Sequence, residues 1–420
     1  MLTQAFYSGI TGLQSNSTGI DVVTNNLANI NTVGYRSYDV EFSSLFEESL
    51  VSMGSSNVAN SSVGIGTRVS STAMRESTGS ILLSDRNTDL AIDGDGWFSV
   101  KGEGNPLYTR DGNFTFDTNN DLVSTDGLYV LGTMGNNISQ NNTLTNKLDT
   151  LGLSEVDQQE KLRFPKYLTY PPEATKNVQF FGNLGLTKDT RTMGTSVVDK
   201  QNNRNQLILE FNQKDIQTPP GVQWDVVATI KSVDGETTFN TKSGVVEFDA
   251  TGALVSNSLQ TIDNQGTTVN IDLGSGYSGV IATNTTSVTG SSTADGTIGG
   301  DLLGYEINRN AEVIASFTNG EQSVVGKVAL FHFQNDQGLD RLNGSRFQES
   351  SNSGKAIFYK NEKGENINSS SILNFSLEGS NYDMASGLTE LIILQRAYDA
   401  SSKLVTTADQ MMQKALSMDA

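Results

Sequence analysis

Three short segments of this 420-residue chain carry residues whose types and spacing could do chemistry. The segments that begin at Asp85 and Asp117 start like calcium-binding loops, but both have leucine instead of glycine at the sixth position and lack glutamate at the twelfth. Gly274, Gly276 and Gly279 have the spacing of a dinucleotide-binding fingerprint, yet a β-branched run follows them instead of the helix that would receive the phosphate. We therefore predict two turns and a strand connection, with no metal site and no cofactor.

His332 is the only histidine, and the chain has no cysteine. The histidine lies in an alternating apolar run typical of a strand, and no serine nucleophile motif accompanies it. The absence of cysteine removes disulfides, thiolate metal ligands and thiol catalysis together. The sequence thus predicts a protein that is not an enzyme and has no catalytic residues.

The charge balance excludes further classes of partner. The formal net charge is −19, whereas a nucleic-acid backbone requires clustered lysine and arginine. The first basic residue is Arg36 and residues 1–20 hold no continuous apolar core, so we expect no cleaved signal peptide. No apolar run reaches the ~18 residues of a membrane span, so we expect no membrane insertion. Export, if it occurs, would need a route that leaves the N-terminus intact.

The two ends of the chain have helical periodicity, and the long region between them has almost none. Residues 5–28 and 384–417 each show apolar stripes on a weakly charged helix. An isolated helix of this length is marginal in water, and no partner segment is evident near the first one. We expect the helices to lie side by side and to contact copies of themselves in other subunits. The residues predicted to carry this self-assembly are Phe6, Ile10, Leu13, Ile20, Leu27, Leu388, Leu391, Leu394, Ala397, Tyr398, Leu404, Val405, Ala408, Met411 and Met412.

The central region has the alternation and the Asp-Gly turn dipeptides of β-structure. The predicted fold is mainly β with terminal α-helices, in a nested, discontinuous architecture in which the helices form a coiled-coil-like inner domain beneath two β-rich outer domains. The expected parts are an inner helical polymerisation domain of residues 1–30 plus 384–420, an extended connector of 31–75, a discontinuous β domain of 76–140 plus 301–376, and an inserted outer β domain of 141–300.

Residues 25–36, with the sequence Asn-Asn-Leu-Ala-Asn-Ile-Asn-Thr-Val-Gly-Tyr-Arg, resemble the N-terminal signature of bacterial flagellar rod and hook proteins. Further similarity lies at 91–98, at 108–114, at 326–333 and in a C-terminal block that begins at Gly379. The C-terminal block departs at Tyr382, where the family usually has valine or threonine. The motif residues carried over from the resemblance are Asn25, Asn26, Ala28, Asn29, Asn31, Thr32, Gly34, Tyr35, Arg36, Gln395 and Arg396.

The resemblance implies a homo-oligomeric helical tube whose inner wall is formed by the paired terminal helices. It also implies export through the flagellar type III apparatus and a location in the extracellular hook or basal body. The partners implied are a distal rod protein, hook–filament junction proteins and a hook cap. The large insert favours a hook subunit, a flexible joint that transmits motor torque to the filament. The alternative is another axial protein of the same family, such as a distal rod component or a hook paralogue.

A carbohydrate-binding or enzymatic β protein is a further alternative. It would require a cluster of aromatic or polar side chains within residues 166–300. Trp224 and Tyr277 are the only Trp or Tyr residues in the strand-like parts of that region.

Overall fold

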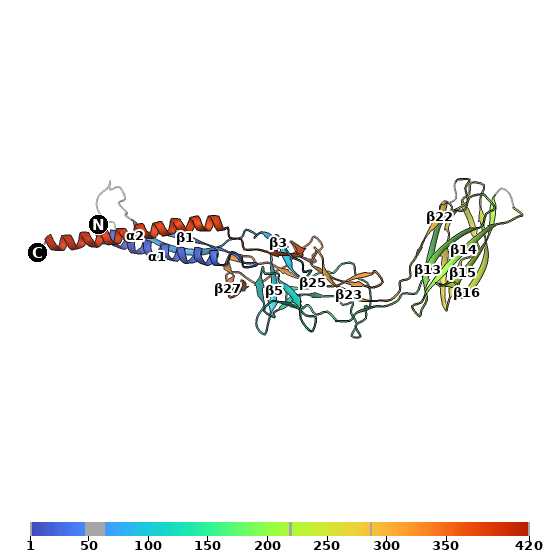
Figure 1. Ribbon diagram of the computed structural model, residues 1–420, viewed down its shortest axis with the longest axis horizontal. Coiled ribbons are helices and arrows are strands. Elements are labelled where there is room, and N and C mark those ends of the chain that lie inside the picture. The colour runs from blue at the N-terminus through green and yellow to red at the C-terminus, as the bar shows by residue number, and fades with distance from the viewer. Residues whose placement is uncertain (1, 47–63, 218–220, 286–287, 419–420) are drawn as a thin grey trace.

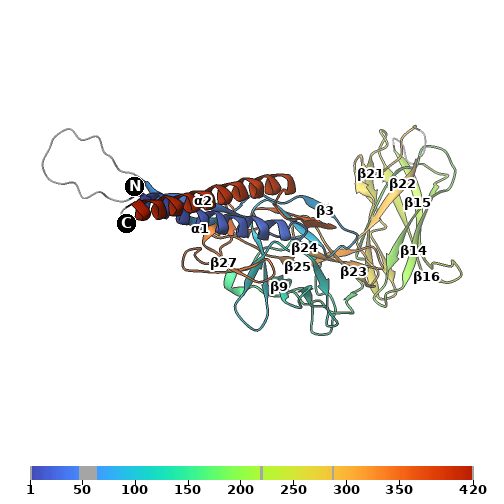
Figure 2. The same ribbon diagram turned by 60° about the vertical axis from the view of Figure 1, so that its left-hand side comes forward.

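The computed structural model describes residues 2–46, 64–217, 221–285 and 288–418. The chain is elongated, with two helices at one end, a β domain in the middle and a second β domain at the far end (Figures 1 and 2). This confirms the predicted fold class, mainly β with one helix at each terminus.

Helix α1 (Leu2–Ala28) and helix α2 (Met384–Met418) lie side by side and run in opposite directions (Figure 1). Glycines allow the two backbones to approach closely. A Cβ added to Gly9 would lie 2.6 Å from Cγ2 of Val405, and one added to Gly12 would lie 2.9 Å from Oγ of Ser401. These glycines lower the intrinsic helix propensity of α1, and the structure gives them a packing role.

A β-hairpin covers another part of α1. Strand β1 (Tyr38–Phe46) pairs antiparallel with strand β2 (Gly64–Met74). The Ser15 hydroxyl donates a hydrogen bond to the carbonyl of Thr67 at 3.1 Å. Where the sequence predicts an extended connector over 31–75, the described parts of that segment instead form a hairpin that packs on α1. The expectation that α1 has no nearby partner was therefore wrong, because Phe42 packs against Gly19 and the hydroxyls of α1 bond to the backbone of this polar-looking segment.

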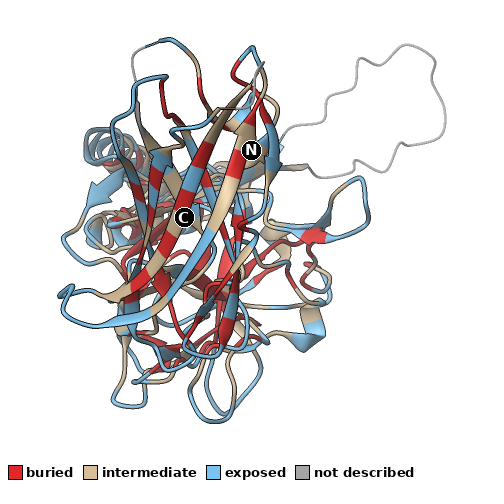
Figure 3. Cartoon of the chain, turned by 90° about the vertical axis from the view of Figure 1, so that its right-hand side faces the viewer, coloured by how far each residue is buried: buried red, intermediate tan, exposed pale blue. Residues whose placement is uncertain are grey.

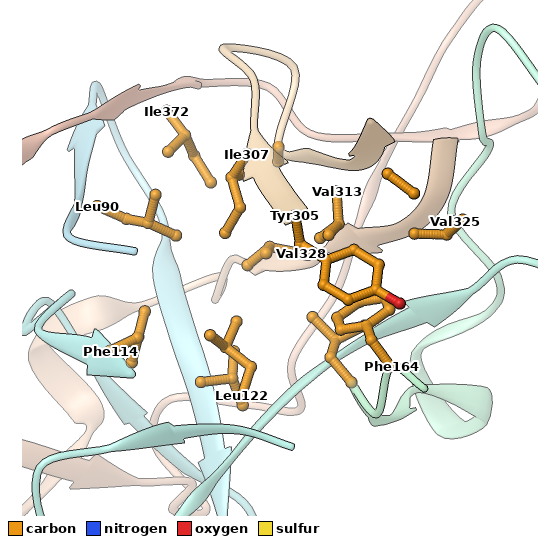
Figure 4. Close-up of a cluster of buried hydrophobic side chains, with 14 of the residues drawn as sticks. Leu90, Phe114, Leu122, Phe164, Tyr305, Ile307, Val313, Val325, Val328 and Ile372 are labelled. Carbon is orange, nitrogen blue, oxygen red and sulfur yellow. The ribbon is translucent and has the colours of Figure 1, made fainter. Parts of the chain in front are cut away.

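The middle domain is built around a large, mostly antiparallel sheet with the strand order β11-β23-β24-β25-β9-β5-β6-β28-β27. Its apolar core gathers side chains from segments far apart in the sequence, including Leu90, Phe164 and Val328 (Figure 4). The strands of this path are β5 (Trp97–Lys101), β6 (Leu107–Thr109), β9 (Tyr129–Met134), β11 (Thr169–Tyr170), β23 (Gly300–Ile307), β24 (Glu312–Phe317), β25 (Gln322–Val328), β27 (Asp340–Leu342) and β28 (Arg346–Gln348).

Shorter strands complete the middle domain and its boundary with the helices. The first group branches from inner strands of the large sheet: β8 (Leu122–Ser124) and β10 (Glu160–Lys161) pair with β9, β26 (Leu330–Phe331) pairs with β5, and β7 (Phe114–Phe116) pairs with β8. The second group forms two-stranded ribbons: β3 (Ile81–Leu83) with β32 (Ser376–Glu378), β4 (Leu90–Asp93) with β31 (Ser371–Asn374), and β29 (Tyr359–Lys360) with β30 (Asn366–Ile367). Two 3-10 turns, η1 (Val156–Gln158) and η2 (Asp336–Gly338), lie in the connections.

The outer domain consists of two sheets that share one apolar core. Buried and exposed residues alternate along its strands, as expected for sheets with one face in a core (Figure 3). One sheet contains β13 (Arg191–Val198), β14 (Arg204–Gln213), β15 (Val222–Ser232), β16 (Thr238–Phe248) and β17 (Leu254–Asn257). The other contains β12 (Asn177–Asn183), β18 (Thr261–Asn264), β19 (Thr267–Asp272), β20 (Gly274–Ser275), β21 (Ser278–Ile281) and β22 (Val288–Ala294).

The inserted outer domain begins later in the chain than residue 141, the predicted start. Leu144, Leu162 and Phe164 are fully buried in the core of the middle domain, although the segment around them is polar in composition. The sheets of the outer domain span residues 177–294, and the chain enters and leaves them side by side, where Glu173 bridges to Thr297. A few apolar side chains in a polar segment place it in a core that composition alone does not reveal.

Candidate self-assembly site

The segments with apparent catalytic spacing are structural turns and strands. Oδ1 of Asp117 accepts hydrogen bonds from the backbone nitrogens of Asn119 and Asp121, both at 2.8 Å, which is the geometry of a turn. The glycine-rich segment forms the antiparallel pair β20–β21, and the next element described after it is strand β22 instead of a helix. Trp224 is fully buried in the core of the outer domain. Over the described residues, no group of three His, Asp or Glu side chains is placed to hold a metal ion.

His332 is buried in the middle domain, where its ring lies near three neighbours. Its Nε2 is 3.0 Å from the Ser369 hydroxyl, its ring centroid is 4.6 Å from that of Tyr359, and its backbone pairs with Ile357. Burial lowers the pKa of His332 to about 4, with Asp95 opposing this effect and Arg110 adding to it. The neutral ring is therefore part of the core.

This burial makes the stability of the middle domain depend on pH. The pKa of His332 rises to its ordinary value of about 6.5 on unfolding, so the unfolded chain binds the proton more tightly. We expect its contribution to be constant above about pH 6.5 and to be lost as pH falls toward 4, by about 3 kcal/mol in total. Urea unfolding of the wild type and His332→Gln between pH 7 and 4 should show a shallower fall in the variant. Parallel curves would contradict the prediction.

One side of α2 remains exposed and apolar after α1 has packed against it. Leu394 and Ala408 are buried toward α1, whereas Ile393, Leu404 and Met411 lie on the adjacent flank and are 62%, 45% and 55% exposed. A groove of about 350 Å³ runs beside this flank and is lined by Ala5, Lys403, Leu404, Thr407, Ala408 and Met411.

The predicted stripe on α1 is displaced from the face that packs within the subunit. The buried residues of α1 are Gly9, Gly12, Ser15, Gly19, Val23 and Asn26. The predicted stripe of Phe6, Ile10, Leu13, Ile20 and Leu27 is only half-buried. It lies about one residue step, or about 100°, around the helix from the buried stripe. Glycines of α1 thus face larger apolar side chains of α2 such as Val405 and Leu394, and the larger apolar side chains of α1 stay partly uncovered.

Helices α1 and α2 together with the β1–β2 hairpin form the helical arm of the subunit. A buried carboxylate holds this arm on the middle domain. Glu378, at the end of β32, lies 3.0 Å from Nη2 of Arg36 and 3.2 Å from Nη1 of Arg110. Its Oε1 also accepts a hydrogen bond from the backbone nitrogen of Gly79 at 3.0 Å. All three charged side chains are at most 4% exposed. Arg36 follows α1, Arg110 follows β6, and Glu378 precedes α2, so one carboxylate joins the roots of both helices to the sheet.

Glu378 is the carboxylate in direct contact with both guanidinium groups, and Asp95 and Asp336 act on them from farther away. Burial and the neighbouring charge of Arg110 lower the pKa of Arg36 to about 10, and Glu378 opposes the shift. Burial also lowers the pKa of Arg110. The guanidinium of Arg36 remains charged at neutral pH, because about 10 is still well above 7, and arginine in general keeps its charge in proteins. Two buried cations therefore share one anion.

Backbone geometry at Gly34 completes the junction. Gly34 has φ +65° and donates its backbone N–H to the carbonyl of Glu378 at 2.7 Å. A Cβ at this position would lie 2.3 Å from the backbone nitrogen of Asp111. Only glycine fits here, because both the positive φ and the close contact exclude a side chain.

Two asparagines of the N- and C-terminal motifs satisfy the backbone at the junction. Asn26 donates to the carbonyl of Tyr38 at 2.7 Å and accepts from its backbone nitrogen at 3.1 Å. Asn381 accepts from the backbone nitrogen of Ser37 at 2.7 Å and donates to the carbonyls of Arg75 and Ser77 at 3.0 Å. The motif residues thus connect α1, the hairpin and the start of α2.

A second contact joins the arm to the hairpin β27–β28. The guanidinium carbon of Arg341 lies 5.1 Å from the ring centroid of Tyr35 and 4.9 Å from that of Tyr38. Gln337 makes two hydrogen bonds of 2.7 Å with the backbone of Met74. These contacts support the arm on the side opposite α2.

Some motif residues lie outside this junction, and some residues of the junction and of the α2 flank are not among those predicted from the sequence. Asn25, Ala28 and Asn31 are exposed near the end of α1, and Gln395 and Arg396 are exposed on α2. Sequence alone does not distinguish Glu378 from the other acidic residues. Ile392 and Ile393 are exposed on α2 and lie outside the predicted stripes, although their position on an amphipathic helix is a signal that sequence provides.

Family models match three parts of the chain. A model described as "Flagella basal body rod protein" matches residues 6–36, one described as "Flagellar hook protein FlgE/F/G D1 domain" matches 91–155, and one described as "Flagellar basal body rod FlgEFG protein C-terminal" matches 374–418. These segments contain most of α1, part of the middle domain and all of α2.

Curated relatives match over the whole chain. The flagellar hook protein FlgE of Borreliella burgdorferi is 30% identical, covering 98% of this chain and 99% of its own length. FlgE of Escherichia coli is 26% identical, covering 97% and 98%. The crystal structure of Helicobacter pylori FlgE2 shares the fold with a TM-score of 0.54 at 16% identity, and the match covers 71% of this chain and all of that one. The chain belongs to the FlgE family of flagellar hook proteins.

Proposed function

We propose that this chain is a structural subunit of the bacterial flagellar hook that assembles with copies of itself into a helical tube. The observation that carries this proposal is the exposed apolar flank of α2, formed by Ile393, Leu404 and Met411 beside the groove between the helices. An apolar patch of this kind on a weakly charged helix is a surface for protein contact. In the assembly, the flank of α2 and the half-buried stripe of α1 would pack against neighbouring arms in a coiled-coil-like manner.

The three parts of the elongated subunit support separate roles for the helical arm, its junction with the middle domain, and the β domains. The helical arm would line the tube, the buried Glu378 junction would set its orientation, and the β domains would stack outward. The outer domain connects to the middle domain through two adjacent strands of chain, near Glu173 and Thr297. Such a connection favours small movements between domains, which a bending tube that transmits motor torque requires.

The full-length match favours a hook subunit over a rod component. Two of the three family models carry rod names, which keeps a distal rod protein or hook paralogue as the second candidate. The relatives named as hook proteins, however, align over nearly the whole chain, including the outer domain.

The proposed partners are other copies, a distal rod protein, hook–filament junction proteins and a hook cap, reached after export through the flagellar type III apparatus. The proposed role is structural and not enzymatic, and no helix in the described ranges has the length and apolarity of a membrane span.

Electron microscopy of basal bodies from a strain that lacks this gene tests the proposal. We expect complete rods that end without a hook, restored by the wild-type gene. Absent or truncated rods would replace the proposal by the rod alternative. Normal hooks and filaments would contradict it.

A further inference from the structure

The chain contains two Asn-Gly dipeptides, Asn319–Gly320 and Asn343–Gly344, in different surroundings. Asparagine followed by glycine is prone to deamidation, because glycine has no Cβ to obstruct attack by its backbone nitrogen on the preceding side chain. Both dipeptides lie in turns between strands of the middle domain, so the pair provides its own comparison.

At Asn319 every group needed for the reaction is occupied. The side-chain nitrogen donates to the carbonyl of Ile298 at 2.7 Å, and the side-chain oxygen accepts from the backbone nitrogen of Glu321 at 3.0 Å. The attacking nitrogen, that of Gly320, donates to the carbonyl of Phe317 at 3.0 Å. Reaction at this site would first require these hydrogen bonds to break.

At Asn343 the same groups are free. The residue is exposed at the tip of β27–β28, and among the described residues neither its side chain nor the backbone nitrogen of Gly344 has a hydrogen-bond partner. Gly344 has φ +72°, and the guanidinium of Arg346, which also pairs with Asp126, lies beside it. A nearby cation favours the deprotonated form of the attacking nitrogen.

We propose that Asn343 is a site of spontaneous deamidation, set by the fold and not by the dipeptide alone. The nitrogen of Gly344 loses its proton and bonds to Cγ of Asn343, and the bond from Cγ to the side-chain nitrogen breaks, releasing ammonia. Water then opens the cyclic imide to give aspartate or isoaspartate, with no oxidant or reductant involved.

The location gives this modification a structural consequence. Asn343 lines a groove of about 370 Å³ between the β27–β28 turn and the end of α1, together with Asn25, Asn29 and Tyr35. The product carboxylate would lie close to Arg341, whose guanidinium contacts Tyr35 and Tyr38. Deamidation would therefore place a negative charge at the second contact between the arm and the middle domain.

Peptide mass spectrometry of the full chain, incubated at neutral pH and sampled over days, tests the proposal. We expect deamidation about tenfold faster at Asn343 than at Asn319, which corresponds to about 1.4 kcal/mol in the barrier. Asn343→Gln should remove the signal assigned to this site. In denaturant the two sites should react at similar rates.

Two results would overturn the proposal. Equal rates in the folded protein, or a faster reaction at Asn319, would show that the hydrogen bonds do not control reactivity. A tenfold difference that persists in denaturant would assign the effect to neighbouring residues in the sequence and not to the fold.

Discussion

Replacing Glu378 by glutamine should lower the free energy of unfolding of the arm and middle domain by about 3–5 kcal/mol. The glutamine has nearly the same shape, but it leaves the buried guanidinium groups of Arg36 and Arg110 without a counter-ion. Breaking such a buried network by removing one partner is costly, because the remaining charges cannot be resolvated. Urea unfolding and limited proteolysis of the full chain measure the effect.

A matched control separates this effect from any loss of negative charge. Glu236→Gln makes the same chemical change at an exposed turn of the outer domain and should be neutral within about 0.5 kcal/mol. The outer domain has its own core, so its unfolding transition should not move in Glu378→Gln. A Glu378 variant as stable as the control would show that the cluster does not hold the arm in place.

Ile393→Asp should prevent assembly while leaving the subunit folded. If Ile393 is buried between copies, the new carboxylate is desolvated without a partner, at a cost of several kcal/mol per subunit. A cost of about 3 kcal/mol raises the concentration needed for assembly more than about a hundredfold. Sedimentation of the purified chain under assembling conditions measures this, and circular dichroism checks the fold.

The choice of position follows from the structure. Leu394 lies against Gly19 inside the subunit, so Leu394→Asp would disturb folding and assembly together. Gln410→Asp adds the same charge at an exposed polar position of α2 and should assemble nearly as the wild type does. If Ile393→Asp assembles and sediments at the same concentrations as the wild type, this flank is not part of the interface.

The sequence predicted the terminal helices because each has a long, strong periodic pattern. It predicted the β-rich centre from alternation and Asp-Gly turns, and it predicted the turn at Asp117 from the missing calcium ligands. These features are local, so neighbouring residues are enough to read them.

Contacts between distant segments could not be read in this way. The face of α1 that packs within the subunit carries glycine and serine, so an apolar-stripe search selects the neighbouring face instead. Glu378 contacts Arg36 and Arg110 from positions hundreds of residues away, and nothing local marks it. The membership of residues 141–170 in the middle domain likewise depends on a few buried side chains such as Phe164.

Thiol labelling tests the central claim, burial of the α2 flank between copies, most directly, because the chain has no cysteine of its own. Ile393→Cys and, as a control, Glu236→Cys are labelled in the unassembled subunit and in isolated hooks. We expect both to react in the unassembled subunit, and only Glu236→Cys to react in hooks. Equal reactivity of Ile393→Cys in both states would contradict an assembly built on this face of the helix.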